Sequence, residues 1–317
     1  MANVTVQNTT ASLTSKTLMK LEDTQTVTGQ KTFDLGASAP FVCVSGAAKV
    51  DNLDADKLDG QTGSYYNDAA NLTGLVPATG VCVEQTYTST GAQNDVAPSA
   101  GAMVIVLCTG AAPAITGFTG GAQGRKLLLV CKGTTLKVSD QTGSSAANQI
   151  ICESTQGQIV GVNGQILLVY DTVSAKWRAN LLSPGAPISF TPTIGGSGGQ
   201  SGQVYTQQVG RYQQRGRSAQ AWFDVELSTL GTITTSVQIQ SLPLTSQNTT
   251  GLLSSVRIGS WTALTTAIVS MYGTMPVNGT AITIFGAAAA ATGVTALVQA
   301  DLSNTSQIIG SIDYPIN

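Results

Sequence analysis

This chain of 317 residues is long enough for about two domains, and its apolar fraction of 42% beside only 10% charged residues predicts a folded chain. The formal net charge of −2 and the scattered Lys and Arg residues argue against nucleic-acid binding. Histidine is absent, which excludes Ser-His-Asp and Cys-His catalysis and the usual His-containing zinc sites.

The first 49 residues carry few large apolar side chains. Residues 11–21 fit one short amphipathic helix, and residues 23–49 fit extended strands interrupted by Gly and Pro. Such a segment cannot supply its own core, so we expect several copies to wrap each other or the segment to dock onto a larger structure. We expect neither a signal peptide nor insertion into a membrane, because no run approaches the ~20 apolar residues of a membrane helix.

Residues 50–77 begin with a charged turn that is compatible with a helix and stops at Gly60. Its aspartates do not fit a calcium loop, because Leu58 occupies the fifth position counted from Asp54 and Tyr65 occupies the twelfth. We therefore expect no metal and favour a solvated helix start or one with salt bridges between chains. The residues that we assign to oligomerisation are Asp56, Lys57, Leu58, Asp59, Tyr65 and Tyr66.

Residues 78–183 read as a block of short strands separated by Gly, Ser and Asn. The glycine-rich stretch 117–124 leads into Arg125 and a strand, so a hairpin turn is favoured over a phosphate-binding loop. We expect Trp177 to be a core or interchain anchor. The expected strands are 80–86, 102–108, 126–131, 135–138, 149–152, 158–162 and 165–170.

The five cysteines are widely spaced, form no CxxC motif and have apolar neighbours. This pattern favours buried free thiols over disulfides or a zinc site, and it suggests assembly in a reducing cytoplasm. The five residues are Cys43, Cys82, Cys108, Cys131 and Cys152.

A Pro-rich link at residues 184–192 separates a second block of strands. Residues 195–199 match G-x-S-x-G, but a nucleophile elbow also needs a histidine base, so we interpret this stretch as a Gly/Ser loop. The strands expected after it are 202–212, 219–227, 232–239, 252–258, 267–272, 281–285 and 307–314.

The segment 222–227 is the one place where catalytic chemistry fits the pattern. Strand periodicity puts Trp222, Asp224 and Glu226 on one face, with the two carboxylates about 7 Å apart. An aromatic ring beside two acids is an arrangement that glycoside hydrolysis uses. A polar sheet face or a seam between subunits is the favoured interpretation, and we expect no catalytic residue.

Two motifs carry a resemblance to known proteins. The stretch ADKLDG followed by YY and NLTG, within residues 50–77, and the stretch TVTGQKTF at residues 26–33 resemble signatures of bacteriophage tail-fibre and related virion-fibre proteins. The ending VYD…SAKW at residues 169–177 is similar to a recurrent β module of tail fibres. The pattern VYTQQVGRY…AWFDVELS…LPLTS…IGSW resembles, more loosely, a receptor-binding fibre tip.

The resemblance implies a mainly β, elongated homotrimeric fibre with two β-sandwich-like domains behind a small helical or extended attachment region. Residues 1–77 would attach to a tail baseplate, collar or neighbouring fibre and drive trimer formation. Residues 78–185 would form a central β domain, and residues 186–317 a sandwich tip that binds a host-surface glycan or protein receptor. Such a protein belongs to the virion, is assembled in the bacterial cytoplasm and needs no cofactor.

Aromatic rings in the second block are the natural platforms for a sugar. Each ring has the competing interpretation of a core side chain, and Trp261 is the one that we expect in an exposed loop. The candidate receptor-binding residues are Tyr205, Tyr212, Trp222, Trp261 and Tyr272. Two alternatives stay open: a purely structural collar, baseplate or head-fibre component, and a polysaccharide depolymerase that uses Asp224 and Glu226.

Overall fold

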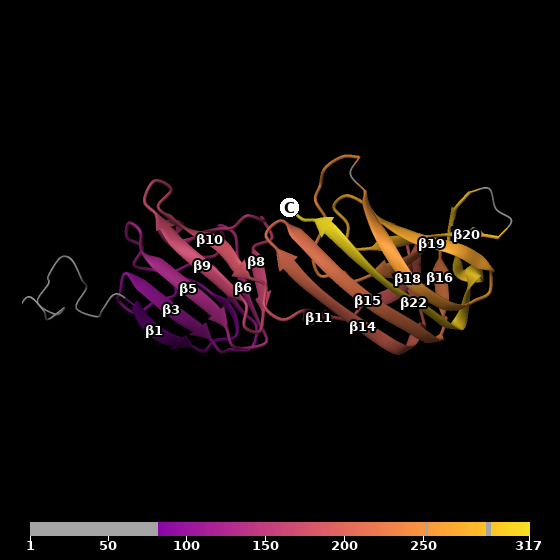
Figure 1. Cartoon of the computed structure of the whole chain (residues 1–317), viewed down its shortest axis with the longest axis horizontal. Coiled ribbons are helices and arrows are strands. Elements are labelled where there is room, and N and C mark those ends of the chain that lie inside the picture. Colours follow the sequence, from indigo (N-terminus) through magenta and orange to yellow (C-terminus); the bar gives the residue numbers. More distant parts are fainter. Residues whose placement is uncertain (1–81, 252, 290–292) are drawn as a thin grey trace, which may run out of the picture. The chain divides into compact units, whose positions relative to one another are not determined.

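The computed structural model describes residues 82–251, 253–289 and 293–317, and Figure 1 shows them as an all-strand arrangement. By its internal contacts the chain divides into residues 1–59 and residues 60–317, and every described element lies in the second unit. The expectation of a mainly β fold is confirmed, and the helical elements of the described residues are 3-10 turns. The attachment region and its oligomerisation residues Asp56, Lys57, Leu58, Asp59, Tyr65 and Tyr66 lie outside the described residues.

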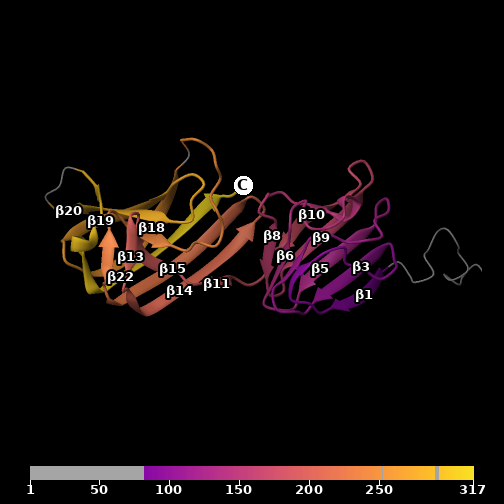
Figure 2. The same ribbon diagram turned by 180° about the vertical axis from the view of Figure 1, so that it is seen from behind.

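Residues 82–138 wind as a solenoid, in which the chain alternates between two parallel sheets. The first sheet takes β1 (Cys82–Tyr87), β3 (Met103–Cys108) and β5 (Lys126–Cys131), while the second takes β2 (Gly91–Gln93), β4 (Pro113–Ile115) and β6 (Thr135–Val138). Cys82 is opposite Met103, which is opposite Lys126, so successive turns stack in register. Figures 1 and 2 show β1, β3 and β5 side by side in this order.

Antiparallel strands end the solenoid. β8 (Gln158–Gly161) pairs with β6, and β9 (Gln165–Asp171) pairs with β5, so the chain reverses its direction in both sheets. β10 (Lys176–Ser183) then follows β9, and β7 (Ile150–Ile151) lies at the far edge of the six-stranded sheet. The sandwich expected for this block is therefore wrong: each turn of one winding chain adds a strand to each of two sheets, and the strands of successive turns from β1 to β6 pair in parallel.

The interior of the solenoid is filled by aliphatic side chains around one tryptophan. Trp177 is fully buried, and its Nε1 donates to the carbonyl of Phe118 at 2.8 Å. The rings of Phe118 and Tyr170 meet it edge-on, with centroids 6.2 and 5.2 Å away. The expected anchor role of Trp177 is confirmed as a core contact.

The described cysteines are free thiols, as expected, but they are not all buried. Cys108 and Cys131 are fully buried side by side in β3 and β5, and burial raises the pKa of Cys108 to about 12. Cys152 is half-buried, whereas Cys82 is exposed because β1 is an edge strand with no turn of described chain outside it.

Two stacked glycines set how closely the turns of the solenoid approach. A Cβ at Gly110 would lie 1.5 Å from the carbonyl oxygen of Ser89, and one at Gly133 would lie 2.0 Å from the carbonyl oxygen of Gly110. Each glycine follows two residues after the last residue of a strand, Cys108 or Cys131. The backbone of one turn therefore rests directly on the next at this corner.

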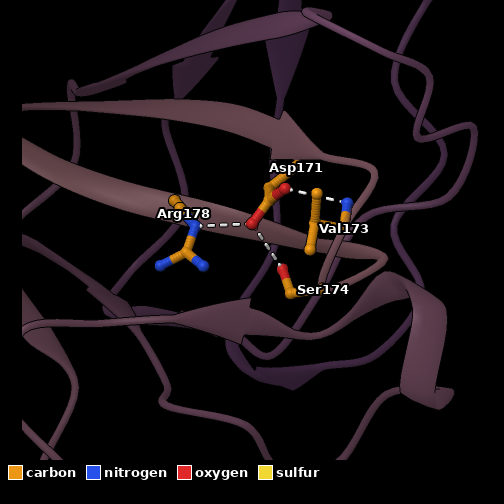
Figure 3. Close-up of polar contacts among 4 residues, drawn as sticks. All are labelled: Asp171, Val173, Ser174 and Arg178. Atoms are coloured by element: carbon orange, nitrogen blue, oxygen red, sulfur yellow. Dashed lines mark hydrogen bonds and ion pairs between the residues drawn. The ribbon is translucent and has the colours of Figure 1, made fainter.

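The hairpin between β9 and β10 is organised by one carboxylate (Figure 3). Asp171 accepts hydrogen bonds from Arg178 Nε at 2.8 Å, Ser174 Oγ at 2.9 Å and the Val173 amide at 2.9 Å. These contacts, led by the Arg178 bond, lower the pKa of Asp171 to about 2. The turn leaves Val173 almost fully exposed at its tip.

Residues 188–316 form one antiparallel sheet that curls around its own core. Its order is β11 (Ile188–Phe190), β14 (Val204–Arg215), β15 (Ser218–Thr229), β22 (Leu302–Pro315), β18 (Ser254–Leu264), β19 (Ile268–Met275), β20 (Ile282–Ala288), β17 (Val237–Gln240) and β12 (Thr193–Gly196), with β21 (Thr295–Ala296) on β20. β13 (Gly199–Ser201) and β16 (Thr232–Thr234) form a separate pair.

The two edge strands of this sheet, β11 and β12, follow each other directly in the chain. β11 ends at Phe190 and β12 begins at Thr193, so the connection spans at most ~11 Å. Tyr205 of β14 bridges the same gap, because its hydroxyl donates to the Ile194 carbonyl at 3.0 Å and accepts from the Ile194 amide at 3.2 Å. The expected sandwich of two sheets is again wrong: a single sheet closes on itself.

The enclosed core takes alternate residues from each long strand. Phe223, Val225 and Leu227 of β15 point inward, as their sequence periodicity predicts. The rest of this core comes from the other strands and from Leu297 and Leu302, which flank η3 (Gln299–Asp301). Its largest members include Ile194, Tyr212, Ile239, Met275, Ile284, Leu302, Ile308 and Tyr314.

Amide side chains join the loop after β7 to the curled sheet. Gln214 is almost fully buried; its Nε2 donates to the Gly157 carbonyl at 2.8 Å, and its Oε1 accepts from the Ile159 amide at 2.9 Å. Gln156 makes the reciprocal pair, donating to the Thr245 carbonyl at 2.7 Å and accepting from its amide at 2.9 Å. All four bonds use backbone groups as partners.

We expect Gly110→Ala to destabilise the solenoid strongly, because the added methyl group would have to displace the backbone at Ser89. A loss of about 1–3 kcal/mol in the free energy of unfolding is the expected size for overpacking. Chemical denaturation measures it. The matched control is Gly259→Ala, because a Cβ there would meet only the Ile309 carbonyl oxygen at 3.9 Å. Equal effects of the two substitutions would contradict the stacked-turn geometry.

The pKa of Asp171 predicts how the β9–β10 hairpin responds to acid. Because the folded pKa of about 2 lies below the ordinary value of about 3.9, the carboxylate stabilises the fold fully above about pH 4. That contribution is lost as the pH falls through about 2. We expect Arg178→Gln to raise the pKa of Asp171 toward its ordinary value, as measured by an NMR titration of the carboxyl carbon. An unchanged pKa would rule out Arg178 as the main cause.

Candidate functional site

The outward face of the curled sheet carries one continuous row of side chains across six strands. Register pairs Arg211 with Trp222, Trp222 with Ser311, Ser311 with Arg257, Arg257 with Tyr272, and Tyr272 with Phe285. Every member is half-buried or exposed, while the neighbouring residues along each strand face the core. Figure 1 shows β14, β15, β22 and β18, four of the strands that carry the row, side by side.

A hollow of about 640 Å³ opens beside this row where two strands separate. Pairing of β18 with β19 stops at Arg257 and Tyr272, and beyond it β18 bulges at Ile258–Ser260 against β22. The strands diverge at this fork, where half-buried Ile258 and buried Met271 line the hollow. The side chains that line the hollow from the outward face are Gln220, Ser255, Arg257, Tyr272, Ser311 and Asp313.

A second, smaller depression of about 210 Å³ lies over β14, β15 and β22. Trp222, Val209 and Ile309 give it an apolar floor, and Arg211 and Asp224 stand at its sides. Gly310 lines it through its backbone; a Cβ there would point toward the core, 2.6 Å from the Phe223 ring. The depression can hold a flat apolar face against the Trp222 indole.

The two carboxylates that line the hollows, Asp224 and Asp313, have hydrogen-bond donors. Asp224 accepts from the side-chain amide of Gln207 and, at 2.8 Å, from that of Gln307. Asp313 accepts from Ser218 Oγ at 2.6 Å. The Arg211 guanidinium donates to the Ser189 hydroxyl.

Three of the five candidate rings do not belong to this outward row. Tyr212 is buried in the core edge-on to Phe190, with centroids 6.3 Å apart, and burial raises its pKa. Tyr205 packs against the core and is held by its bonds to Ile194. Trp261 lies within β18, half-buried against the core, and not in the exposed loop that we expected.

The two remaining candidates, Trp222 and Tyr272, both face outward and line the two hollows. Tyr272 stacks on Phe285, with ring centroids 5.3 Å apart and planes 11° apart. This stack fixes the ring's orientation at the side of the larger hollow. The sequence reasoning thus identified one platform in each hollow but included three rings that lie elsewhere.

The acidic pair of the depolymerase hypothesis shares a face, as its periodicity predicts. Asp224 lines the smaller depression, but Glu226, one step further along β15, lines neither hollow. The G-x-S-x-G match at residues 195–199 spans the turn between β12 and β13, where Ser197 Oγ contacts Thr235 Oγ1 at 2.5 Å. Among the described residues, the hydrogen-bond partner of the Ser197 side chain is therefore a hydroxyl group and not a general base.

Sequence reasoning missed the polar half of the larger hollow. Arg257, Gln220 and Ser311 come from three strands that are far apart in the chain, and only the register of β15, β22 and β18 brings them together. Within the described part of the chain, no group of three or more acidic or sulfur ligands could hold a metal ion. None of the described helical turns is long or apolar enough to cross a membrane.

Comparison with known proteins shows a likeness of fold and none of sequence. No protein-family model and no curated protein matches the sequence. Among solved structures, the fold is similar to that of the Dettilon tailspike protein (gp208), with 13% sequence identity and a TM-score of 0.40 over 76% of this chain. The chain spans 47% of the length of that protein.

Proposed function

We propose that this chain is a virion fibre protein of a bacteriophage. Residues 1–77 attach it to a baseplate, collar or neighbouring fibre, and the curled sheet binds a glycan on the host surface. The outward row with its two hollows is the observation that carries the binding half of this proposal. The KLDG and TVTGQKTF motifs support the fibre half.

The chemistry of the row suits a sugar better than an apolar ligand. Trp222 and Tyr272 offer ring faces on which a sugar ring can stack, while Gln220, Ser255 and Ser311 offer donors and acceptors to hydroxyl groups. The hollows are open and shallow on a sheet face, so they accommodate part of a polymer chain. A small enclosed ligand would need a deeper pocket.

The proposal predicts that Trp222→Ala and Tyr272→Ala each weaken binding of the full chain to surface glycans by about tenfold or more, since a stacked ring is worth roughly 1–3 kcal/mol. Binding is measured on whole bacteria of candidate hosts and on arrays of their purified surface glycans. Val173→Ala, at the exposed hairpin tip, is the control and should change nothing.

Other outcomes of this assay separate the alternatives. Binding that neither ring substitution affects would contradict the site, and absence of binding to every host surface would favour a purely structural virion part. Release of reducing ends from a host polysaccharide, abolished by Glu226→Gln, would support the depolymerase that pairs Asp224 with Glu226.

We expect the full-length chain to be a homotrimer, because the polar N-terminal segment cannot supply its own core. Light scattering should then give three times the chain mass of 32.4 kDa. Weakening the assembly by Leu58→Asp or Tyr66→Asp, within the oligomerisation segment, should lower that mass. A monomeric wild-type protein would overturn the fibre architecture.

A further inference from the structure

The two hollows are parts of one surface. Trp222, in the smaller depression, is the direct neighbour of Ser311, in the larger one, because β15 and β22 are paired there. From Trp222 to Tyr272 the row crosses three strand spacings, which is about 14 Å. A ligand that reaches both rings must therefore be a chain of several units that lies across the strands.

The larger hollow is lined by a guanidinium whose donors are unused among the described residues. Arg257 lies in the floor of the larger hollow, between Ser311 and Tyr272, and its guanidinium has no hydrogen bond or ion pair with any described residue. The hollow is also lined by Asp313, whose carboxylate accepts a hydrogen bond from Ser218 Oγ at 2.6 Å but forms no ion pair with Arg257. In the other depression Asp224 accepts from two glutamine amides.

A guanidinium with free donors selects for a planar anion. Its parallel N–H groups match a carboxylate in a bidentate geometry that neutral hydroxyl groups cannot reproduce. Arg211 adds a second positive charge beside Trp222, at the opposite end of the row. The negative charges on the same face are Asp313 in the larger hollow, Asp224 in the smaller depression, and Glu226, which lines neither.

We infer that the row binds an acidic polysaccharide laid across the strands, with Arg257 bound to a carboxylate of one unit and Trp222 stacked on another. This inference deepens the proposed function and rests on it. It adds three things that the proposed function does not specify: the charge of the glycan, the direction in which the glycan chain crosses the sheet, and the residue that binds its charged group.

The test compares acidic polymers with their neutral counterparts. Polygalacturonate, alginate and polysialic acid are each presented to the full-length protein before and after chemical reduction of their carboxyl groups. We expect at least one acidic polymer to bind, and its reduced form to bind about tenfold more weakly or worse, since a charge-assisted bidentate contact is lost. Raising the salt concentration should weaken binding of the acidic form only.

Substitution of Arg257 assigns the effect to this residue. Arg257→Gln should cost about as much as carboxyl reduction and should abolish the difference between the two polymers. Arg217→Gln is the matched control, because Arg217 is exposed in the β14–β15 turn and lines neither hollow. Equal binding of the acidic and reduced polymers would overturn the inference, as would an Arg257→Gln variant that still discriminates between them.

The two proposals fail in distinguishable ways. If the protein binds host cells through Trp222 and Tyr272 but binds none of the acidic polymers, the acidic-ligand inference is overturned and the receptor-binding function stands. If it binds neither cells nor polymers, both are overturned.

Discussion

The closure of the curled sheet by the short link between β11 and β12 is the constraint on which the functional face depends. Only Thr191 and Pro192 separate these two edge strands, so the sheet must curl until its edges meet. Pro192 also fixes one backbone angle of the link and leaves no amide there to be satisfied. Once the sheet is closed, alternate residues of every strand are enclosed and the others face solvent together.

The outward row is a direct consequence of that closure. Long strands such as β14, β15 and β22 run beside each other with few register breaks, so neighbouring outward side chains line up across them. Where the pairing of β18 with β19 stops, beyond Arg257 and Tyr272, the larger hollow opens beside the row. The closed sheet therefore carries both the row and the larger hollow on its outward face.

The sequence predicts the local structure well and the pairing poorly. The predicted strands 126–131 and 135–138 coincide with β5 and β6, and the face assignment of residues 222–227 is correct. Period-two alternation looks the same in parallel and antiparallel strands, so it cannot distinguish a solenoid from a sandwich. The three-residue strands β2 and β4 are too short to show any period.

The solenoid nevertheless leaves a signal that could have been used. Cys108-Thr109-Gly110 and Cys131-Lys132-Gly133 end two apolar runs in the same way, and the structure stacks the two glycines. A recurring apolar run, cysteine and glycine is the mark of a repeated turn. For Tyr212 the signal is contradictory: its polar neighbours Arg211 and Gln213 fit an inward ring, but Gln214, two residues on and on the same strand face, is polar although buried.

The shallow form of the site argues for several copies acting together. An open sheet face leaves one side of a bound polymer in water, so each contact is weak and affinity for a single site is limited. A homotrimer, as proposed here, would convert later binding events into intramolecular ones, which raises avidity without any new contact. Backbone-directed bonds from Gln156 and Gln214 restrain the curled sheet, and such restraint reduces the entropy lost when several sites bind one polymer surface.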